Sequence, residues 1–322
     1  MCRHLAIIVV SLVLPLLTGC SSTKTCAIPG VQTRPSTQNS ATPSVHLNHV
    51  YLTLDAETFA AINESSFMRD RFCLFGHSIP EPSASNAVPT TYLIGQNTCL
   101  ELLAAANTRA ETEGNAGVCF STRQAGDIDI VYDNLCTALG PDIQNGYVTF
   151  NTGARRIPWL RYVSSHRVKQ TPPLLTWVVE YDAKFHKAVG FSSGRHLAKL
   201  RQTDLPTPPQ KQYPQKLLRN IESVTLAVTQ PEFNHLSTEL AAFGYVRKEQ
   251  KGLTVFSGPG VEIRAAVAPD PQYRIRSLQC SLTSKPKTPI QKTFGDKATL
   301  TLTEDAVAIW TFGPPQEHYA RN

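Results

Sequence analysis

Hydrophobic and polar residues along the chain predict one order of elements that recurs. The first unit starts with an extended run at 47–54. Asp55 is a good N-cap for the helix that follows, and apolar residues at helical spacing carry this helix to about residue 70. Three further extended runs complete the unit, at 72–75, 91–94 and 98–103. The predicted order is therefore β-α-β-β-β.

A second unit of the same order starts about 70 residues later. Its first strand is predicted at 117–121 and its helix at about 125–139. Its remaining strands are predicted at 146–151, 157–163 and 174–181.

The pattern returns after a proline-rich linker at 205–214. An alternating strand at 221–228 leads into a capping box formed by Thr229 and Glu232, and Gly244 is a suitable helix stop. Strands are then predicted at 244–248, 253–256, 260–267, 274–282, 298–303 and 306–312. The last group has no helix, so a fourth unit is predicted to be degenerate.

Three short sequences carry a family resemblance: Leu-Asn-His-Val-Tyr at 47–51, Phe-Met-Arg-Asp-Arg-Phe at 67–72 and Cys-Leu-Glu-Leu-Leu at 99–103. With the order of elements, they resemble the vicinal oxygen chelate superfamily of glyoxalase I, bleomycin-resistance proteins and extradiol dioxygenases, and within it an uncharacterised bacterial glyoxalase-like lipoprotein family. The resemblance implies an α+β fold. Tandem βαβββ modules at 47–182 would form a half-open barrel, and a second, smaller βαβββ-like domain would occupy 218–313.

The resemblance also implies a site. In metal-binding members the ligands come from the first and last strands of each module, and His49, Glu101 and Glu180 match three of these positions. The fourth falls near Val118, where glyoxalase I carries histidine. Cys119 is adjacent, but as the next residue in a strand it is expected to point to the other face.

One imidazole and two carboxylates in a cup can hold a divalent metal such as Zn, Ni, Fe or Mn. Such a metal would polarise a carbonyl or enediolate oxygen, and Glu101 or Glu180 would act as the catalytic base, which gives isomerase, lyase or oxygenase chemistry. Two alternatives stay open: a metal-free protein that binds or sequesters a small molecule, and an envelope scaffold with a vestigial cup. In the structural alternative, a strand glutamate pairs with Arg156 or Arg161 and the histidine only forms hydrogen bonds.

The N-terminus predicts an exported, lipid-anchored protein. Residues 1–19 fit a signal peptide, with basic residues before the apolar run 5–17, which is short for a membrane span. Leu-Thr-Gly-Cys at 17–20 resembles a bacterial lipobox, which implies acylation of Cys20, including a palmitate chain, and anchoring in the lipid bilayer; the alternative is an ordinary secretory signal. Ser21 follows where an aspartate would favour the inner membrane, so the outer membrane facing the periplasm is expected. Residues 20–46 have the composition of a flexible tether.

Charge and short motifs exclude some other functions. The net charge of +6 fits a solvated basic face, and the basic run at 195–201 lacks the aromatic residues or module of a nucleic-acid site, so no nucleic-acid partner is expected. The Gly-x-Ser-x-Gly sequence at 190–194 lacks the buried strand that a nucleophile elbow needs, so it is interpreted as a turn in the connecting segment 183–217. Residues 314–322 form a tail. Two modules within one chain can complete a cup, so dimerisation is not required, and the ligand and oligomeric state stay open.

Besides Cys20, six cysteines follow the signal peptide: Cys26, Cys73, Cys99, Cys119, Cys136 and Cys280. An oxidising compartment permits disulfides, but six cysteines leave the pairing open. There is no CxxC pair for a zinc or redox motif. Several of these cysteines lie in apolar strands, where free buried thiols are the alternative.

Overall fold

The structure is a computed structural model that describes residues 42–78, 89–105, 112–151, 155–166, 172–188, 216–250 and 252–314. The predicted signal peptide, Cys20 and most of the tether lie outside the described residues. The same holds for the Gly-x-Ser-x-Gly sequence, the basic run and the proline-rich linker. Among the described residues, no helix is long and apolar enough to cross a membrane.

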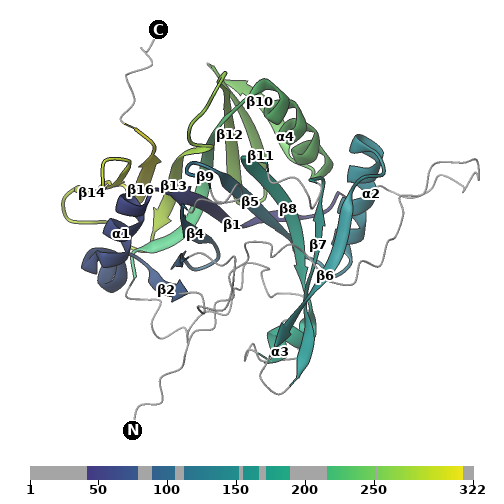
Figure 1. Ribbon diagram of the computed structural model, residues 1–322, viewed down its shortest axis with the longest axis horizontal. Helices are drawn as coiled ribbons and strands as arrows, with labels where there is room; N and C mark the ends of the chain where they lie inside the picture. Colours follow the sequence, from purple (N-terminus) through teal and green to yellow (C-terminus); the bar gives the residue numbers. More distant parts are fainter. Residues whose placement is uncertain are drawn as a thin grey trace, which may run out of the picture.

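The N-terminal half forms one open sheet of eight strands, sheet A, in the order β2-β3-β4-β1-β5-β8-β7-β6 (Figure 1). Module 1 comprises β1 (Val45–Leu54), α1 (Ala56–Glu64), a short π-helix η1 (Met68–Phe72), β2 (Leu74–Ser78), β3 (Thr90–Ile94) and β4 (Cys99–Ala104). Module 2 comprises β5 (Ala116–Thr122), α2 (Asp127–Leu139), β6 (Gln144–Asn151), β7 (Arg156–Ser164) and β8 (Leu174–Tyr181), and is followed by α3 (Ala183–Ala188). The two βαβββ modules meet at the antiparallel pair of β1 and β5.

The C-terminal half forms a second sheet, sheet B, in the equivalent order β10-β11-β12-β9-β13-β16-β15-β14. Module 3 comprises β9 (Leu218–Val228), α4 (Gln230–Ala242), β10 (Val246–Gln250), β11 (Leu253–Gly258) and β12 (Val261–Val267). Module 4 comprises β13 (Ile275–Leu282), β14 (Ile290–Phe294), β15 (Ala298–Leu302) and β16 (Val307–Phe312). The predicted α+β fold of βαβββ modules is therefore confirmed, and sheet B has as many strands as sheet A.

Module 4 lacks a helix, as predicted, and this absence reverses one strand direction. In modules 1 to 3 the first and last strands run parallel, because the helix adds one reversal of the chain. In module 4 the reversal is missing, and β13 and β16 are antiparallel.

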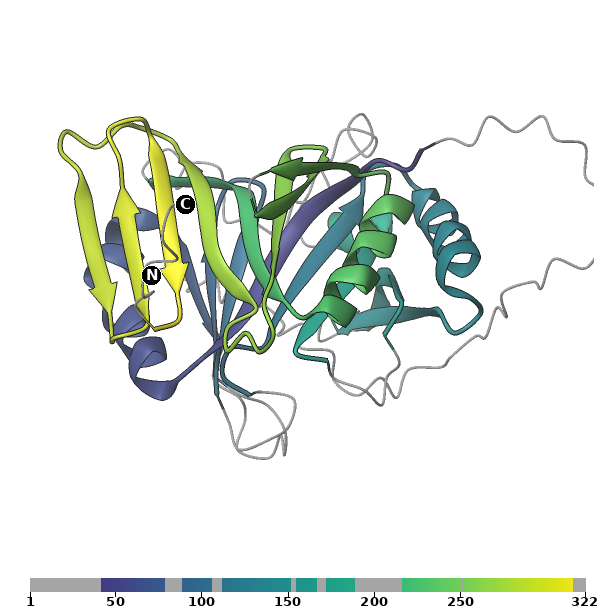
Figure 2. The ribbon, with the colours of Figure 1, turned by 90° about the horizontal axis from the view of Figure 1, so that it is seen from above.

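Helix α1 of module 1 covers the sheet of module 4 in place of the missing helix. At one end of the molecule α1 contacts β14, and at the other end α2 contacts α4 (Figures 1 and 2). In the first pair a strand thus takes the place that a helix has in the second. Phe72, the last residue of η1, packs edge-on against Trp310 of β16 with ring centroids 6.1 Å apart. Lys297, after β14, lies 2.7 Å from Glu113 and 3.8 Å from Asp55, the N-cap of α1. Residues far apart in sequence thus hold the two halves together.

One large apolar core joins the two sheets. It contains Leu52 and Phe120 of sheet A, Val224 and Trp310 of sheet B, and Ile62 of α1 between them. The sheets therefore lie back to back with helices between them, and the opposite face of sheet A points away from this core. We call that opposite face the cup face.

Candidate functional site

A β-bulge in β1 brings two polar side chains to the cup face together. The pairing of β1 with β5 shifts register between Leu47 and His49. Leu47 and Val50 both pack into the common core, so the two residues between them, Asn48 and His49, share the opposite face. Both are buried, and Asn48 Oδ1 accepts a hydrogen bond of 2.7 Å from His49 Nδ1. In this bond Nδ1 carries the ring proton, so Nε2 of the neutral ring has a lone pair that can accept a hydrogen bond.

Glu101 of β4 lies beside that nitrogen. Leu100 and Leu102 pack into the common core, so Glu101 points to the cup face, with its Oε2 3.8 Å from His49 Nε2. The side chains of His49 and Glu101 are 6% and 2% exposed. Neither His49 Nε2 nor Glu101 Oε1 has a hydrogen-bond partner among the described residues. The structure thus brings two of the three predicted site residues together and leaves both with an unpaired polar atom.

Burial sets the charges of the pair. It lowers the pKa of His49 to about 3, so the imidazole is neutral at pH 7. It raises the pKa of Glu101 to about 7, and a hydrogen bond from Tyr92 opposes this rise. A carboxyl group with this pKa can both take up and release a proton at neutral pH.

Aromatic side chains form the wall around the pair. The ring of Trp177 in β8 lies 5.4 Å from that of His49, edge-on, and 5.9 Å from that of Tyr51. Gly117 of β5 allows this packing, because a Cβ there would lie 2.1 Å from Tyr51 and 2.7 Å from Trp177. Tyr181 donates a 3.5 Å hydrogen bond to Asn48 Oδ1. The cup face is therefore a mostly apolar layer of buried side chains in which Asn48, His49 and Glu101 are polar.

Glu180 does not join that pair. Its carboxylate accepts hydrogen bonds from Thr122 Oγ1 at 3.0 Å and from the backbone N–H groups of Gly126 at 2.9 Å and Ile128 at 3.4 Å. These groups surround the start of α2, which has no N-cap side chain of its own. In β8 it is Trp177, Val179 and Tyr181 that point to the cup face, so strand alternation directs Glu180 to the helix side.

In β5, too, the residue that faces the cup is the neighbour of the one that the resemblance implies. Val118 packs into the common core, whereas Cys119 lies on the cup face, paired in register with His49. Burial and the neighbouring Glu101 raise the pKa of the Cys119 thiol well above its ordinary value. Cys73, Cys99 and Cys280 are also free and buried, as in the free-thiol alternative, while Cys136 is disulfide-bonded.

The residues of the cup do not fit a resident metal ion. Catalytic zinc sites use three protein ligands, and among the described residues of the cup His49 and Glu101 do not form a group of three with Cys119 or any other candidate ligand. Among the described residues, the one group of three or more candidate ligands lies elsewhere, and it comprises His166, His235 and Glu239. The predicted trio of His49, Glu101 and Glu180 is not assembled.

The sequence does not predict that second group. His235 and Glu239 are four residues apart on α4, a spacing that places them on one helix face and that the sequence does show. His166 follows β7, and no local pattern connects it to the other two. The group therefore exists only through the packing of module 2 against module 3.

Comparison with protein-family models gives a match to a family of unknown function. The model of this family (DUF5829) matches residues 47–312. A comparison with curated proteins found no match.

Solved structures with some similarity have low identity to this chain. A hypothetical protein from Staphylococcus aureus has a TM-score of 0.45 and 12% identity, covering 77% of this chain and 95% of its own. A mutant of 4-hydroxymandelate synthase from Streptomyces coelicolor has a TM-score of 0.37 and 13% identity, covering 71% and 66%. A mutant of homoprotocatechuate 2,3-dioxygenase from Brevibacterium fuscum has a TM-score of 0.37 and 10% identity, covering 88% and 76%. The fold described above rests on strand order and not on these similarities.

Proposed function

The chain belongs to the family of unknown function DUF5829, and we propose that it is a cell-envelope lipoprotein that binds a small molecule on its cup face. The observation that carries this proposal is the buried pair of His49 and Glu101, each with a polar atom that lacks a partner. Leaving buried polar atoms unpaired costs about 1–3 kcal/mol each, so a ligand that pairs them recovers that energy.

The pair and its wall define the class of ligand. The Nε2 lone pair of neutral His49 accepts a hydrogen bond, and Glu101 accepts or donates one according to its protonation. The buried aromatic rings of Tyr51 and Trp177 lie beside the pair. We therefore expect a compact, largely apolar or aromatic molecule that carries a hydroxyl group. This argues for the metal-free binding alternative over metal-assisted chemistry in the cup.

Phenol and toluene are matched probes of this proposal, because they share a ring and differ in the hydroxyl group. We expect binding of phenol, measured by calorimetry or ligand-observed NMR, to exceed that of toluene. His49→Ala and Glu101→Gln should reduce this preference, whereas Glu222→Gln on sheet B should not. Equal binding of both probes by wild type and by both cup variants would leave the scaffold alternative as the better explanation.

A second candidate function follows from the burial of Glu101 beside His49 Nε2 and from its raised pKa. A buried carboxyl group with a pKa of about 7 is suited to removing a proton next to a carbonyl, the step shared by many isomerases and lyases. Exchange of the methyl protons of acetone in D₂O, followed by NMR, tests this capacity. Glu101→Gln should abolish any exchange above the buffer rate while leaving the phenol complex detectable.

The lipid anchor has its own test. Cys20 lies outside the described residues, and the case for its acylation is the lipobox-like sequence. We expect Cys20→Ala to prevent acylation and release the protein from the membrane fraction, and Cys26→Ala to leave both unchanged. Retention of the Cys20→Ala variant in membranes would contradict the anchor.

A further inference from the structure

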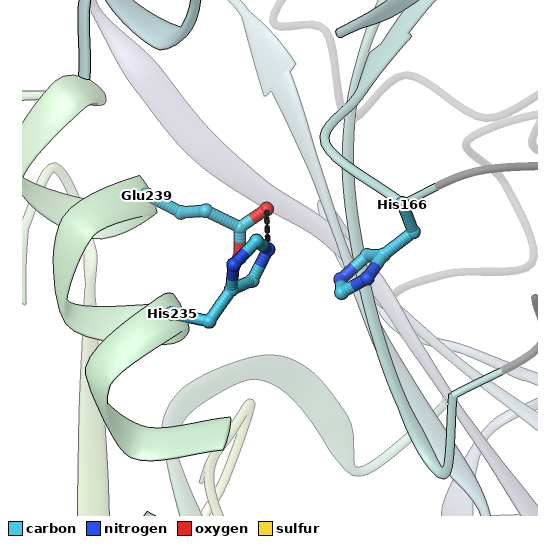
Figure 3. A group of neighbouring side chains, drawn as sticks. All are labelled: His166, His235 and Glu239. Carbon is cyan, nitrogen blue, oxygen red and sulfur yellow. Dashed lines mark ion pairs between the residues drawn. The ribbon is translucent and has the colours of Figure 1, made fainter. Parts of the chain in front are cut away.

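Three side chains that can bind a metal meet where sheet A contacts α4. His235 and Glu239 project from α4 toward the end of β7, and His166 points back toward them (Figure 3). We propose that His166, His235 and Glu239 bind one Zn²⁺ ion that joins module 2 to module 3. This site is separate from the cup, and it does not depend on the function proposed there.

The distances are close to those of a zinc site. The candidate ligand atoms of the three residues all lie within 4.8 Å of one another, and His235 Nε2 is 3.7 Å from Glu239 Oε1. Zinc–ligand distances near 2.1 Å in a tetrahedron place ligand atoms about 3.4 Å apart. The two residues of α4 nearly meet this value already. His166 has to approach by about 1 Å, which rotation of a half-buried side chain on a bend provides.

Two hydroxyl groups orient the donors. Ser165 Oγ lies 2.7 Å from His235 Nε2 and donates to Glu239 Oε1, so it bridges the two atoms that the metal would join. Thr176 Oγ1 donates to Glu239 Oε2 and lies 3.5 Å from His166 Nε2. A bound ion would take the place of the Ser165 hydroxyl between His235 Nε2 and Glu239 Oε1, while the bond from Thr176 would hold Glu239 Oε2 as an outer-shell contact.

Charge provides the second argument. Glu239 is 1% exposed, yet among the described residues no lysine or arginine forms an ion pair with it. A buried carboxylate without a cation is costly, and a divalent ion supplies the missing positive charge. Two imidazoles and one carboxylate form a ligand set that zinc accepts, and a fourth ligand could be water.

The test uses the mature chain, purified with a tag that contains no histidine and stripped of metal with EDTA. We expect calorimetry to show one Zn²⁺ per chain and added Co²⁺ to give the visible absorption of a tetrahedral complex. Zn²⁺ should also raise the Tm, because the ion binds residues from two modules of the folded state. His166→Gln and His235→Gln should each weaken Zn²⁺ binding by more than about a hundredfold, the upper end of the cost of losing an outer-shell partner.

Two controls make the result specific. Asn234→Ala changes an exposed neighbour on α4, and His49→Ala removes the histidine of the cup; both should keep the zinc affinity and the cobalt spectrum. His166→Gln, confirmed as folded by circular dichroism, avoids the risk of altering the buried Glu239. The proposal is wrong if folded wild type binds no Zn²⁺, if binding survives both His166→Gln and His235→Gln, or if it is lost with His49→Ala.

Discussion

The backbone N–H of Gly126, which precedes α2, donates a hydrogen bond of 2.9 Å to the carboxylate of Glu180 on β8. Glu180 thereby supplies the N-terminal cap that the sequence of α2 lacks. A carboxylate at this end also interacts favourably with the positive end of the helix dipole. We expect Glu180→Gln to lower the free energy of unfolding by about 1–2 kcal/mol in urea titrations and to leave phenol binding unchanged. The exposed Glu249→Gln serves as the control and should leave the unfolding midpoint in place. Loss of phenol binding at unchanged stability would instead put Glu180 in the cup.

Glu101 should make stability depend on pH. Its pKa rises from an ordinary value of 4.5 to about 7 in the folded protein, so between these values the unfolded chain releases a proton that the folded protein keeps. Stability from this group is complete below pH 4.5 and is lost as pH rises to about 7, by about 3 kcal/mol at most.

His49 acts in the opposite direction, because burial lowers its pKa from 6.5 to about 3. Because wild type and Glu101→Gln both contain His49, the difference between their free energies of unfolding reports the pH dependence that Glu101 alone contributes. Urea unfolding across this pH range should show wild type losing stability relative to the variant as pH rises. A difference that stays constant from pH 4.5 to pH 8 would contradict the raised pKa.

Gly295, in the turn between β14 and β15, should not tolerate a side chain. Its φ is +56°, and a Cβ would lie 2.7 Å from Thr58 Oγ1 and 3.2 Å from Thr58 Cα in the first turn of α1. Gly260 has a φ of +74° with open space around it. We expect Gly260→Ala to cost about 1 kcal/mol for its backbone conformation, and Gly295→Ala to cost at least about 1 kcal/mol more because α1 must move. Equal costs in thermal or urea unfolding would show that α1 does not lie against this turn.

The two halves should unfold together. The chain has three tryptophans, with Trp159 and Trp177 in sheet A and Trp310 in sheet B. Fluorescence of a Trp310→Phe variant therefore reports on the first half, and that of a Trp159→Phe/Trp177→Phe variant on the second. We expect Phe72→Ala to cost about 3–5 kcal/mol and to shift both transitions equally, because Phe72 packs against Trp310. Two separate transitions, with only one moved, would contradict the shared core.

Local signals in the sequence were sufficient for most elements. Asp55 caps α1 and the Thr229–Glu232 capping box starts α4, as predicted, because such caps depend on residues a few positions apart. The strand β14 was not predicted, since most of its side chains are exposed and its polar sequence resembles a loop.

The faces of the central strands could not be predicted in the same way. Strands β5 and β8 are covered on both sides, so nearly every residue is apolar or buried and alternation gives no phase. The bulge at Asn48 then shifts β1 by one residue relative to β5. The sequence therefore predicts the contact between His49 and Glu101, whereas Glu180 and Val118 lie on the helix side of sheet A and not on the cup face that the resemblance implies.

The missing helix of module 4 also determines an order of assembly. The apolar face of β14–β16 is covered by α1, which is made early in synthesis, whereas these strands leave the ribosome last. Helix α1 is therefore available to cover the apolar face of the last strands as soon as they are synthesised. A C-terminal fragment made alone would expose this face and aggregate, whereas the same segment made after α1 finds its cover already folded.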